Sequence, residues 1–336
     1  MNIEYKPRII DLHQDIGYYI MMGRLNKDFN LRDKNRHGDI PSYKEANVFL
    51  IVGAIFPMLY SYSPYIDRIS RMYGGSGKTF YISPINPIDN ILTQIGIYWR
   101  LSKLYDVINI VRSRETLRDD KINILIGIEG TDGIDDISVI YPLYLAGVRL
   151  VGLTWNFDTK YAASCVSTKD YGLTGYGLEL IDELNRLGII IDLAHSSEKT
   201  MLETIEESSL PVINSHSNYK RIVDHPRNVS YEVLDALRSK GGVIGFTLIK
   251  ETIGGKMGLK DYVSHIIRVR DEVGKDVIAF GSDFFGTTPP KEFDRIDKIG
   301  ELYRLLTENG FTKDDLERFT WRNAYRVIKR HMSKWD

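Results

Sequence analysis

Eight short apolar runs recur along the 336-residue chain, each bounded by polar residues or glycine. Strands that are buried on both faces of a parallel sheet read as nearly continuous hydrophobic segments, so each run is predicted to be a buried strand. The runs are 8–15, 48–57, 122–130, 149–156, 188–196, 211–217, 242–248 and 277–284.

The stretches between most of these runs have the periodicity of amphipathic helices. Between residues 175 and 187, Leu178, Ile181 and Leu184 recur three residues apart among charged side chains. Eight strands that alternate with helices predict an α/β fold, a closed (β/α)₈ TIM-like barrel, with a doubly wound open sheet as the alternative. Further helices are predicted at 198–208, 230–240, 260–273 and 315–330.

The whole chain, residues 1–336, is expected to form one barrel domain, because α/β barrels commonly run to about 250 residues and grow by loop insertion. The stretch 58–86 is rich in Tyr, Ser, Pro and Gly and fits neither a strand nor a helix. We expect a long loop insertion there, after the second strand. Long loops that follow barrel strands usually shape a substrate site or an oligomer contact.

Composition excludes several classes of protein. The 44 Lys and Arg residues balance the 45 Asp and Glu residues, which argues against a basic nucleic-acid binder and against an acidic disordered chain. Cys165 is the single cysteine, which agrees with a reducing compartment. No apolar stretch approaches the roughly 20 residues that cross a bilayer, and the N-terminal residues lack the features of a signal peptide. We therefore expect a soluble, cytoplasmic protein with neither membrane nor nucleic acid as a partner.

Residue types that bind metals stand at the carboxyl ends of five predicted strands. In a barrel these ends meet at one rim, where the active sites of barrel enzymes lie. Two of the residues are two positions apart on the first strand, so their side chains project to the same face. Imidazole and carboxylate together suit zinc or another borderline divalent ion better than calcium. The residues are His13 and Asp15, Glu129, His195, His216 and Asp283.

Each of these residues also has a purely structural interpretation. A His-x-Asp pair can hydrogen-bond at a strand end, a histidine beside an apolar run is often an ordinary core residue, and Glu129 can pair with Arg149. Asp283 follows Gly281 and Ser282, a sequence that is also typical of turns and helix caps. Metal-binding residue types recur at the ends of five strands, and this recurrence favours a metal site. A Glu129 carboxylate shared between two ions would fit ions about 3.5 to 4 Å apart.

Seven motifs, in order along the chain, are similar to those of the membrane (renal) dipeptidases, which are binuclear zinc hydrolases with a (β/α)₈ barrel. The ordered set is specific and covers most of the chain. The motifs are DLHQD at 11–15, GIEG at 127–130, GVR at 147–149 running into LT at 153–154, DLAH at 192–195, NSHS at 214–217, HPRNV at 225–229 and GSD at 281–283.

The resemblance implies a role for each matched residue. Asp283 would transfer a proton, and Arg227 would hold the free carboxylate of a small peptide, for which a guanidinium offers two parallel hydrogen bonds. A D-configured C-terminal residue would be tolerated, and a homodimer is compatible with the resemblance. His13 and Asp15 would bind one metal ion, His195 and His216 the other, and Glu129 would bridge the two ions.

Two positions depart from the renal-type pattern. Trp155 stands where renal-type members carry a histidine that helps to polarise the scissile carbonyl. Indole offers one N–H donor and no titratable base, so Trp155 is a candidate substrate-binding residue of different chemistry. Phe285 replaces the second aspartate of a Gly-Ser-Asp-Phe-Asp-Gly pattern and makes the rim more apolar.

The expected function is hydrolysis of dipeptides by a metal-bridged hydroxide, since coordination lowers the pKa of water to about 7. One alternative is a related amidohydrolase for N-acyl amino acids, lactams or lactones, which the apolar Trp155 and Phe285 favour. A second is a non-catalytic barrel used for binding, with the tyrosine-rich segment around Tyr60 to Tyr81 as a partner surface. Five buried polar groups without a catalytic use argue against the second alternative.

Overall fold

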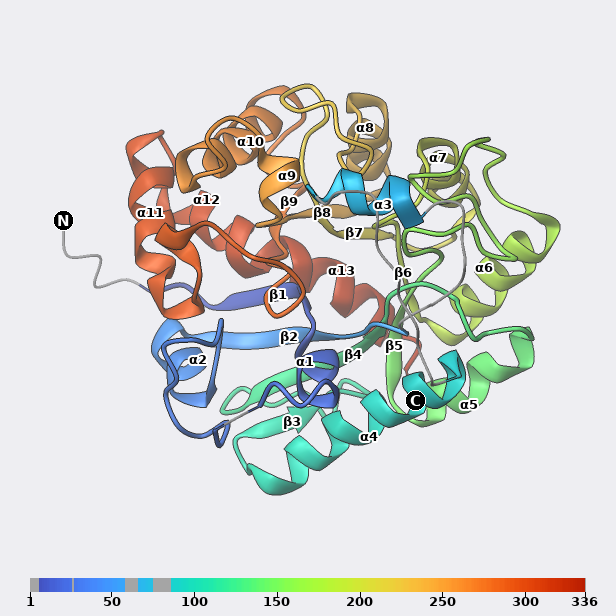
Figure 1. The fold of residues 1–336 in the computed structure, drawn as a ribbon, viewed down its shortest axis with the longest axis horizontal. Helices are drawn as coiled ribbons and strands as arrows, with labels where there is room; N and C mark the ends of the chain where they lie inside the picture. The colour runs from blue at the N-terminus through green and yellow to red at the C-terminus, as the bar shows by residue number, and fades with distance from the viewer. Residues whose placement is uncertain (1–5, 26, 58–65, 75–85, 336) are drawn as a thin grey trace.

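Eight parallel strands form a nearly closed barrel that helices surround (Figure 1). The computed structural model describes residues 6–25, 27–57, 66–74 and 86–335. Every residue of the eight strands is buried, as the apolar runs predict. The predicted TIM-like barrel is therefore confirmed. In sheet order the strands are β1 (Ile9–Gln14), β2 (Val48–Ile55), β4 (Ile122–Ile128), β5 (Val148–Gly152), β6 (Ile190–Asp192), β7 (Ile213–Ser217), β8 (Val243–Phe246) and β9 (Ile278–Phe280).

Two seams of the barrel have little backbone pairing. Between β6 and β7 the register contains one pair, Asp192 with Ile213. Between β9 and β1 the link is a parallel bridge between Gln14 and Phe284, just beyond the end of β9. The other neighbouring strands are paired at three or more positions. We call these two places the narrow seams.

A ninth strand, β3 (Ile108–Ile110), was not predicted from the sequence. It pairs in parallel with Ile122–Ile124, the first half of β4. β5 pairs only with the second half of β4, from Ile126 to Ile128, so β3 occupies the edge that β5 leaves open.

Helices cover the outside of the barrel, and those predicted from periodicity are confirmed to within two residues. The predicted helix at 315–330 is instead three segments, α12, a π-helical turn over Arg318–Arg322, and α13. The helices are α1 (Ile16–Met21), α2 (Ile40–Ala46), α3 (Ile66–Met72), α4 (Pro87–Leu104), α5 (Ile140–Leu145), α6 (Gly175–Leu187), α7 (Glu198–Glu207), α8 (Tyr231–Lys240), α9 (Lys250–Ile253), α10 (Leu259–Glu272), α11 (Ile299–Glu308), α12 (Lys313–Glu317) and α13 (Asn323–Met332).

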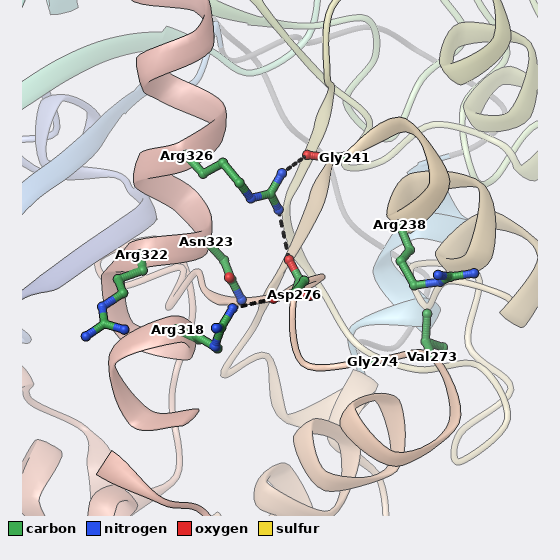
Figure 2. Close-up of a pocket in the computed structure, with 9 residues that line it drawn as sticks. All are labelled: Arg238, Gly241, Val273, Gly274, Asp276, Arg318, Arg322, Asn323 and Arg326. Carbon is green, nitrogen blue, oxygen red and sulfur yellow. Dashed lines mark hydrogen bonds and ion pairs between the residues drawn. The ribbon is translucent and has the colours of Figure 1, made fainter. Parts of the chain in front are cut away.

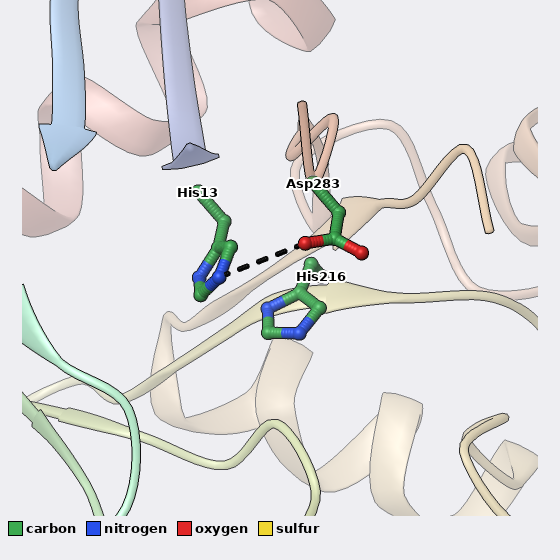
Figure 3. A group of neighbouring side chains, drawn as sticks. All are labelled: His13, His216 and Asp283. Atoms are coloured by element: carbon green, nitrogen blue, oxygen red, sulfur yellow. Dashed lines mark ion pairs between the residues drawn. The ribbon is translucent and has the colours of Figure 1, made fainter. Parts of the chain in front are cut away.

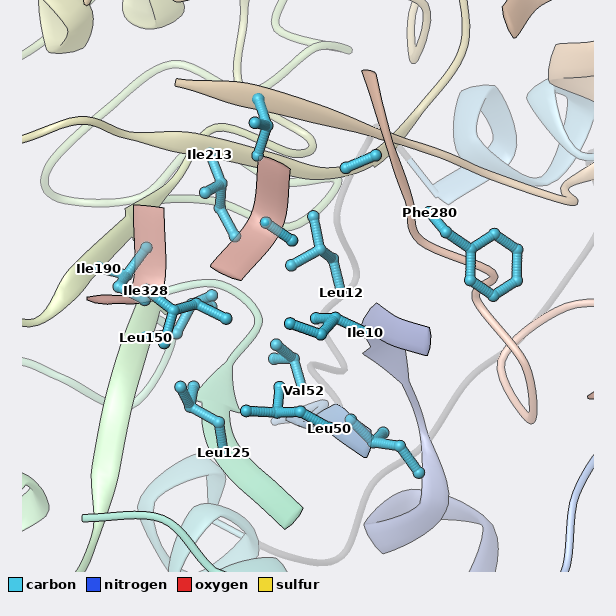
Figure 4. Packing of buried hydrophobic residues seen from close by; sticks show 14 of the residues in the cluster. Ile10, Leu12, Leu50, Val52, Leu125, Leu150, Ile190, Ile213, Phe280 and Ile328 are labelled. Carbon is cyan, nitrogen blue, oxygen red and sulfur yellow. The ribbon is translucent and has the colours of Figure 1, made fainter. Parts of the chain in front are cut away.

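Aliphatic side chains from neighbouring strands fill the core, with Ile328 of α13 among them (Figure 4). Their close packing fixes the strands relative to one another, so the residues at the strand ends are held on a rigid scaffold. The labelled residues are at most 2% exposed, and they are Ile10, Leu12, Leu50, Val52, Leu125, Leu150, Ile190, Ile213, Phe280 and Ile328.

The stretch 58–86 contains helix α3, which corrects the expectation that no helix lies there. The remaining parts, 58–65 and 75–85, lie outside the described residues, as does most of the tyrosine-rich segment around Tyr60 to Tyr81. Ile69 of α3 packs in a small apolar cluster with Phe157 and Val166. This contact places α3 against the loop that follows β5.

Among the helices in the described part of the chain, none combines the length and the apolar character that a bilayer crossing requires.

Candidate active site

The six residues predicted from strand ends come together at one rim of the barrel, and we call them the rim cluster. His13 lies in β1 and His216 in β7. Asp15 and Glu129 follow β1 and β4 directly, and His195 and Asp283 stand three residues beyond the ends of β6 and β9. Figure 3 shows His13, His216 and Asp283 converging from separate elements. Three subsets have ligand atoms within 4.8 Å of one another, namely His13–Asp15–Glu129, Glu129–His195–His216 and His13–His216–Asp283.

Glu129 lies at the centre of the rim cluster, and its two carboxylate oxygens face opposite sides. Oε1 lies 2.8 Å from His195 Nε2 and 3.3 Å from His216 Nε2. Oε2 lies 3.7 Å from His13 Nε2, which is also 3.5 Å from Asp15 Oδ2. The carboxylate of Glu129 therefore joins two groups of nitrogen and oxygen donors.

Hydrogen bonds at the far side of each imidazole fix the tautomers of His195 and His216. His195 Nδ1 lies 2.7 Å from Asn156 Oδ1, an acceptor, so this nitrogen carries the hydrogen. His216 Nδ1 lies 2.8 Å from Ser215 Oγ, whose own hydrogen is donated to Asp192. Both Nε2 atoms consequently present lone pairs toward Glu129, the arrangement that metal-bound histidines require.

The resulting cluster of acceptors fits a divalent cation. The two lone-pair nitrogens of His195 and His216 are 3.1 Å apart, with a Glu129 oxygen beside them and no hydrogen to share. His13 Nε2 is buried and has no hydrogen-bond partner among the described residues. Unpaired polar atoms in a buried site are unfavourable, and a cation bound in place of a proton would satisfy them together. Imidazole nitrogen with carboxylate oxygen is also the donor set that zinc-like ions prefer.

Burial and mutual charge shift the pKa values in the rim cluster in different directions. Burial lowers the pKa of both His195 and His216 well below the ordinary value, so their imidazoles are neutral and available as ligands. Burial opposes a charge on His13, but the carboxylates of Glu129 and Asp15 outweigh it and raise the pKa of His13 to about 10. Burial also raises the pKa of Glu129 to about 7. Crowded carboxylates of this kind need protons or cations to balance them.

Backbone geometry at two rim residues is uncommon for side chains larger than glycine. His195 has a φ of 66° and Asp283 a φ of 59°, both in the left-handed region. Such conformations cost roughly 1 kcal/mol or more and cluster at functional sites, where the surrounding structure holds them. Here they turn each side chain toward the rim within three residues of the end of its strand.

Gly286 lets the chain pass directly beside the carboxylates of the rim cluster. A Cβ at this position would lie 2.2 Å from Asp15 Oδ2 and 2.6 Å from Asp283 Oδ1. Any larger residue would displace both carboxylates, so glycine is required here by close approach rather than by its backbone angles.

A cavity of about 1020 Å³ opens over the rim cluster, and aromatic side chains form its walls. Trp155 lines it and packs against Phe56 and His195, with ring centroids 4.8 and 5.9 Å apart. Phe285 lines it elsewhere and packs against Tyr19, with centroids 5.0 Å apart. The cavity is thus polar at its floor and apolar at its sides.

Arg227 lies buried behind the rim cluster, at 2% exposure. Its Nη2 donates to the carbonyl oxygen of His216 (3.1 Å), and Tyr73 is a further hydrogen-bonding neighbour. Its Nε has no hydrogen-bond partner among the described residues. A buried guanidinium with spare donors is suited to an anionic group of a ligand.

The alternative ion pair between Glu129 and Arg149 does not occur. Arg149 donates instead to the backbone carbonyl oxygens of Arg112, Tyr144 and Val148, and its guanidinium lies 3.8 Å from the centre of the Tyr144 ring. Arg149 therefore holds the chain before β5, while Glu129 faces histidines.

Sequence reasoning assigned no role to the residues that hold the histidines and the strand ends. They are Asn156, Asp192 and Ser215 around His195 and His216, and Asp11 and Ser282 around His13 and Asp283. A signal was present, because a serine directly precedes His216 and Asp283, and an aspartate stands two or three residues before His13 and His195.

Comparison with known proteins gives a consistent set of relatives. The family model of membrane dipeptidases, peptidase family M19, matches residues 2–334. The uncharacterized dipeptidase C965.12 of Schizosaccharomyces pombe is 28% identical, covering 96% of this chain and 80% of that protein. Dipeptidase verJ of Clonostachys rogersoniana is 29% identical, covering 95% of this chain and 83% of that protein.

A solved structure has the same fold. It is a metallopeptidase from Rhodobacter sphaeroides, liganded with a phosphinate mimic of the dipeptide L-Ala-D-Ala. The two chains superimpose with a TM-score of 0.84 at 21% identity, covering 97% of this chain and all of that one.

Proposed function

The chain belongs to the membrane dipeptidase family, peptidase family M19, and from this premise we propose that it cleaves dipeptides with two zinc ions held by the rim cluster. Metal-dependent hydrolysis of the dipeptidase type is the activity of this family and of its named relatives. The observation that carries the finer proposal is the convergence of the His195 and His216 lone pairs on Glu129, whose other oxygen faces His13.

The proposed ligands divide into two groups that share Glu129. His13 and Asp15 would hold one ion and His195 and His216 the other. Bound divalent ions supply a water of lowered pKa and polarise the substrate carbonyl. The neutral imidazoles and the fixed tautomers support this assignment, because they leave the Nε2 atoms ready for coordination.

Asp283 is the proposed proton carrier. Burial and the neighbouring Asp15 raise the pKa of Asp283 well above its ordinary value, so this carboxyl holds a proton more readily than an exposed aspartate does. It lines the cavity, and its Oδ1 lies 3.8 Å from His13 Nε2. From there it would pass the proton to the amine that leaves when the peptide bond breaks.

Arg227 and the aromatic walls are the proposed determinants of substrate choice. The spare donors of Arg227 suit a free C-terminal carboxylate, which would limit substrates to short peptides. The L-Ala-D-Ala mimic bound by the Rhodobacter sphaeroides relative supports acceptance of a D-configured C-terminal residue. Trp155 and Phe285 would favour apolar side chains.

A second candidate is hydrolysis of N-acyl amino acids, lactams or lactones on the same site. The apolar walls formed by Phe56, Trp155 and Phe285 favour it, because an acyl chain needs no partner for an α-amino group. Such substrates would use the same metal ligands.

A substrate panel with metal analysis tests the proposal. Purified protein should contain close to two zinc ions per chain, and a chelator should abolish hydrolysis of L-Ala-L-Ala and L-Ala-D-Ala. N-acetyl-alanine and the amidated dipeptides serve as matched controls and should react slowly. Fewer than one ion per chain would reject the metal assignment, and faster cleavage of N-acetyl-alanine would favour the second candidate.

Location and assembly are also part of the proposal. A cytoplasmic protein agrees with the single cysteine, Cys165, and a homodimer agrees with the family resemblance. Cell fractionation and light scattering of the metal-loaded protein measure the two properties separately.

A further inference from the structure

Two Asp–Ser pairs in the barrel make the same set of hydrogen bonds. Asp192 Oδ2 accepts from Ser215 Oγ (2.5 Å), while Oδ1 accepts from the backbone N–H of Ser215 (2.8 Å) and of Ala194 (3.0 Å). The Asp192 carboxylate thus accepts from the hydroxyl and the backbone N–H of Ser215. It also accepts from the backbone N–H of the residue two positions after Asp192.

The second pair repeats this pattern on the other side of the barrel. Asp11 Oδ2 accepts from Ser282 Oγ (2.5 Å), and Oδ1 accepts from the backbone N–H of Ser282 (2.8 Å) and of His13 (3.3 Å). Gln14 adds one more donor to Asp11 (2.7 Å). All four paired residues are at most 2% exposed.

Each Asp–Ser pair spans one of the two narrow seams. Asp192 ends β6 and Ser215 lies in β7, where the strands share one register pair. Asp11 lies in β1 and Ser282 follows β9, where a single bridge links the strands. The carboxylates therefore supply cross-strand bonds where the backbone supplies fewest.

The serines also act on the residues that follow them. Ser215 Oγ accepts from His216 Nδ1 (2.8 Å), which leaves His216 Nε2 free of hydrogen. Ser282 Oγ accepts from the backbone N–H of Phe284 (3.0 Å) and so holds the turn in which Asp283 has its left-handed backbone. One pair sets a tautomer, and the other sets a backbone turn.

We infer that Asp192–Ser215 and Asp11–Ser282 are positioning residues, each closing one narrow seam and orienting one half of the rim cluster. The orienting role rests on the proposed function, whereas the seam-closing role does not. Hydrogen bonds to a buried carboxylate are stronger than neutral ones, and losing one partner leaves a buried charge poorly solvated. Residues that hydrogen-bond to metal ligands keep those ligands oriented for metal binding.

The seam-closing half is tested without metal by a double-mutant cycle on chelator-treated protein. Asp192→Asn and Ser215→Ala should each raise the unfolding equilibrium constant, measured in urea, by on the order of 10- to 100-fold. The double variant should be destabilised by less than the sum of the two single effects, because both substitutions remove the same bond between Ser215 Oγ and Asp192 Oδ2. Ser217→Ala is the matched control, since this buried β7 hydroxyl has no hydrogen-bond partner among the described residues. Fully additive effects, or a control as damaging as Ser215→Ala, would overturn seam closure.

The orienting half is tested by Co²⁺ titration with visible absorption as the signal. Ser215→Ala should weaken one of the two Co²⁺ sites by about 10- to 100-fold and change its absorption bands, leaving the other site as in the wild type. Ser282→Ala should affect the other site, because the Ser282 hydroxyl also lies 3.4 Å from the carbonyl oxygen of His13. It serves as an independent variant if Ser215→Ala does not fold. Equal weakening of both sites by both variants, or wild-type affinity in both, would overturn the orienting role. Wild-type protein that binds no Co²⁺ would reject the proposed function, while the metal-free cycle still decides seam closure.

Discussion

The two ends of the barrel each gather charged or ligand-type side chains, but they differ in how these side chains are paired. At the amino ends of β8 and β9 lies a cavity of about 610 Å³ that four arginines line (Figure 2). Arg318 pairs with Asp276 (2.5 Å), Arg238 with Asp235 (2.9 Å), and Arg326 donates to the carbonyl oxygens of Gly241 and Asp276. At the rim, by contrast, His13 Nε2 is buried with no hydrogen-bond partner among the described residues.

This difference separates scaffold from site better than charge density does. We call the cavity at the amino ends of β8 and β9 the lower cavity. Its arginines form ion pairs with acidic residues at the surface, where such pairs contribute little to stability. The rim cluster is buried, and its lone pairs face one another across about 3 Å. A cluster of buried metal-ligand side chains that converge in this way indicates a ligand that the protein is built to bind. The predictions below test this contrast.

The largest effect is expected at Glu129. Glu129→Gln removes the shared carboxylate charge, so we expect loss of bound metal and a fall in kcat/KM of about 10³-fold or more, since metal assistance is worth several kcal/mol. Elemental analysis and dipeptide kinetics measure the two quantities. Glu179→Gln, on the exposed face of α6, is the control for loss of one acidic charge. Full metal content with unchanged kcat/KM in Glu129→Gln would show that the rim cluster is only structural.

Arg227 should give the next largest effect. Arg227→Lys keeps the charge but loses the paired donors, and we expect KM for dipeptides to rise by on the order of 100-fold with a smaller change in kcat. C-terminally amidated dipeptides lack the carboxylate, so their slow hydrolysis should change little in the variant. A KM that rises equally for free and amidated dipeptides would place Arg227 outside carboxylate recognition.

Much of this contrast could be predicted from the sequence, because strand ends in a parallel barrel share one rim. His13, Glu129 and His216 stand far apart in the chain, yet the periodicity of buried runs is enough to bring them together. The Asp–Ser pairs could not be predicted in the same way. Their role depends on which neighbouring strands share few paired residues, and the sequence does not reveal that β6 and β7 share one pair or that a single bridge links β1 to the end of β9.

Other features depend on tertiary contacts that leave little trace in composition. Helix α3 lies in a stretch whose Tyr, Ser, Pro and Gly content indicates a loop, and packing of Ile69 against Phe157 and Val166 outweighs that tendency. β3 is three residues long and depends on an open edge of β4. The left-handed backbone at His195 is likewise imposed by its surroundings, since residues other than glycine rarely adopt it, although histidine does so more often than most.

His265 sharpens the comparison as a buried histidine whose two ring nitrogens both have partners. Its Nδ1 accepts from the Tyr219 N–H and its Nε2 donates to the Ile253 carbonyl oxygen, each at 3.0 Å. Burial lowers the pKa of His265 to about 4, below its ordinary value of 6.5. The unfolded chain therefore binds a proton more readily between pH 6.5 and pH 4, and folding stability falls as the pH drops through that range.

We expect His265 to lower the free energy of unfolding by about 2 kcal/mol between pH 7 and pH 5. His265→Gln, which keeps one donor and one acceptor, should show a shallower pH dependence than the wild type. Urea unfolding at both pH values gives the difference, and contributions from other histidines cancel in the comparison. Parallel pH dependences in the two proteins would mean that His265 does not titrate in this range.

The smallest effect is expected in the lower cavity. Arg318→Met removes the pairs with Asp276 and Asp314, whose side chains are 65% and 44% exposed, so the free energy of unfolding should fall by no more than about 1 kcal/mol. Salt screens exposed pairs, and the difference from the wild type should shrink further in about 1 M NaCl. kcat/KM for dipeptides should stay within twofold of the wild type, because this end of the barrel lies opposite the rim cluster. A larger loss of activity than of stability would mean that the arginines communicate with the rim, and the convergence of buried ligand-type side chains would then no longer be sufficient to locate the functional end of the molecule.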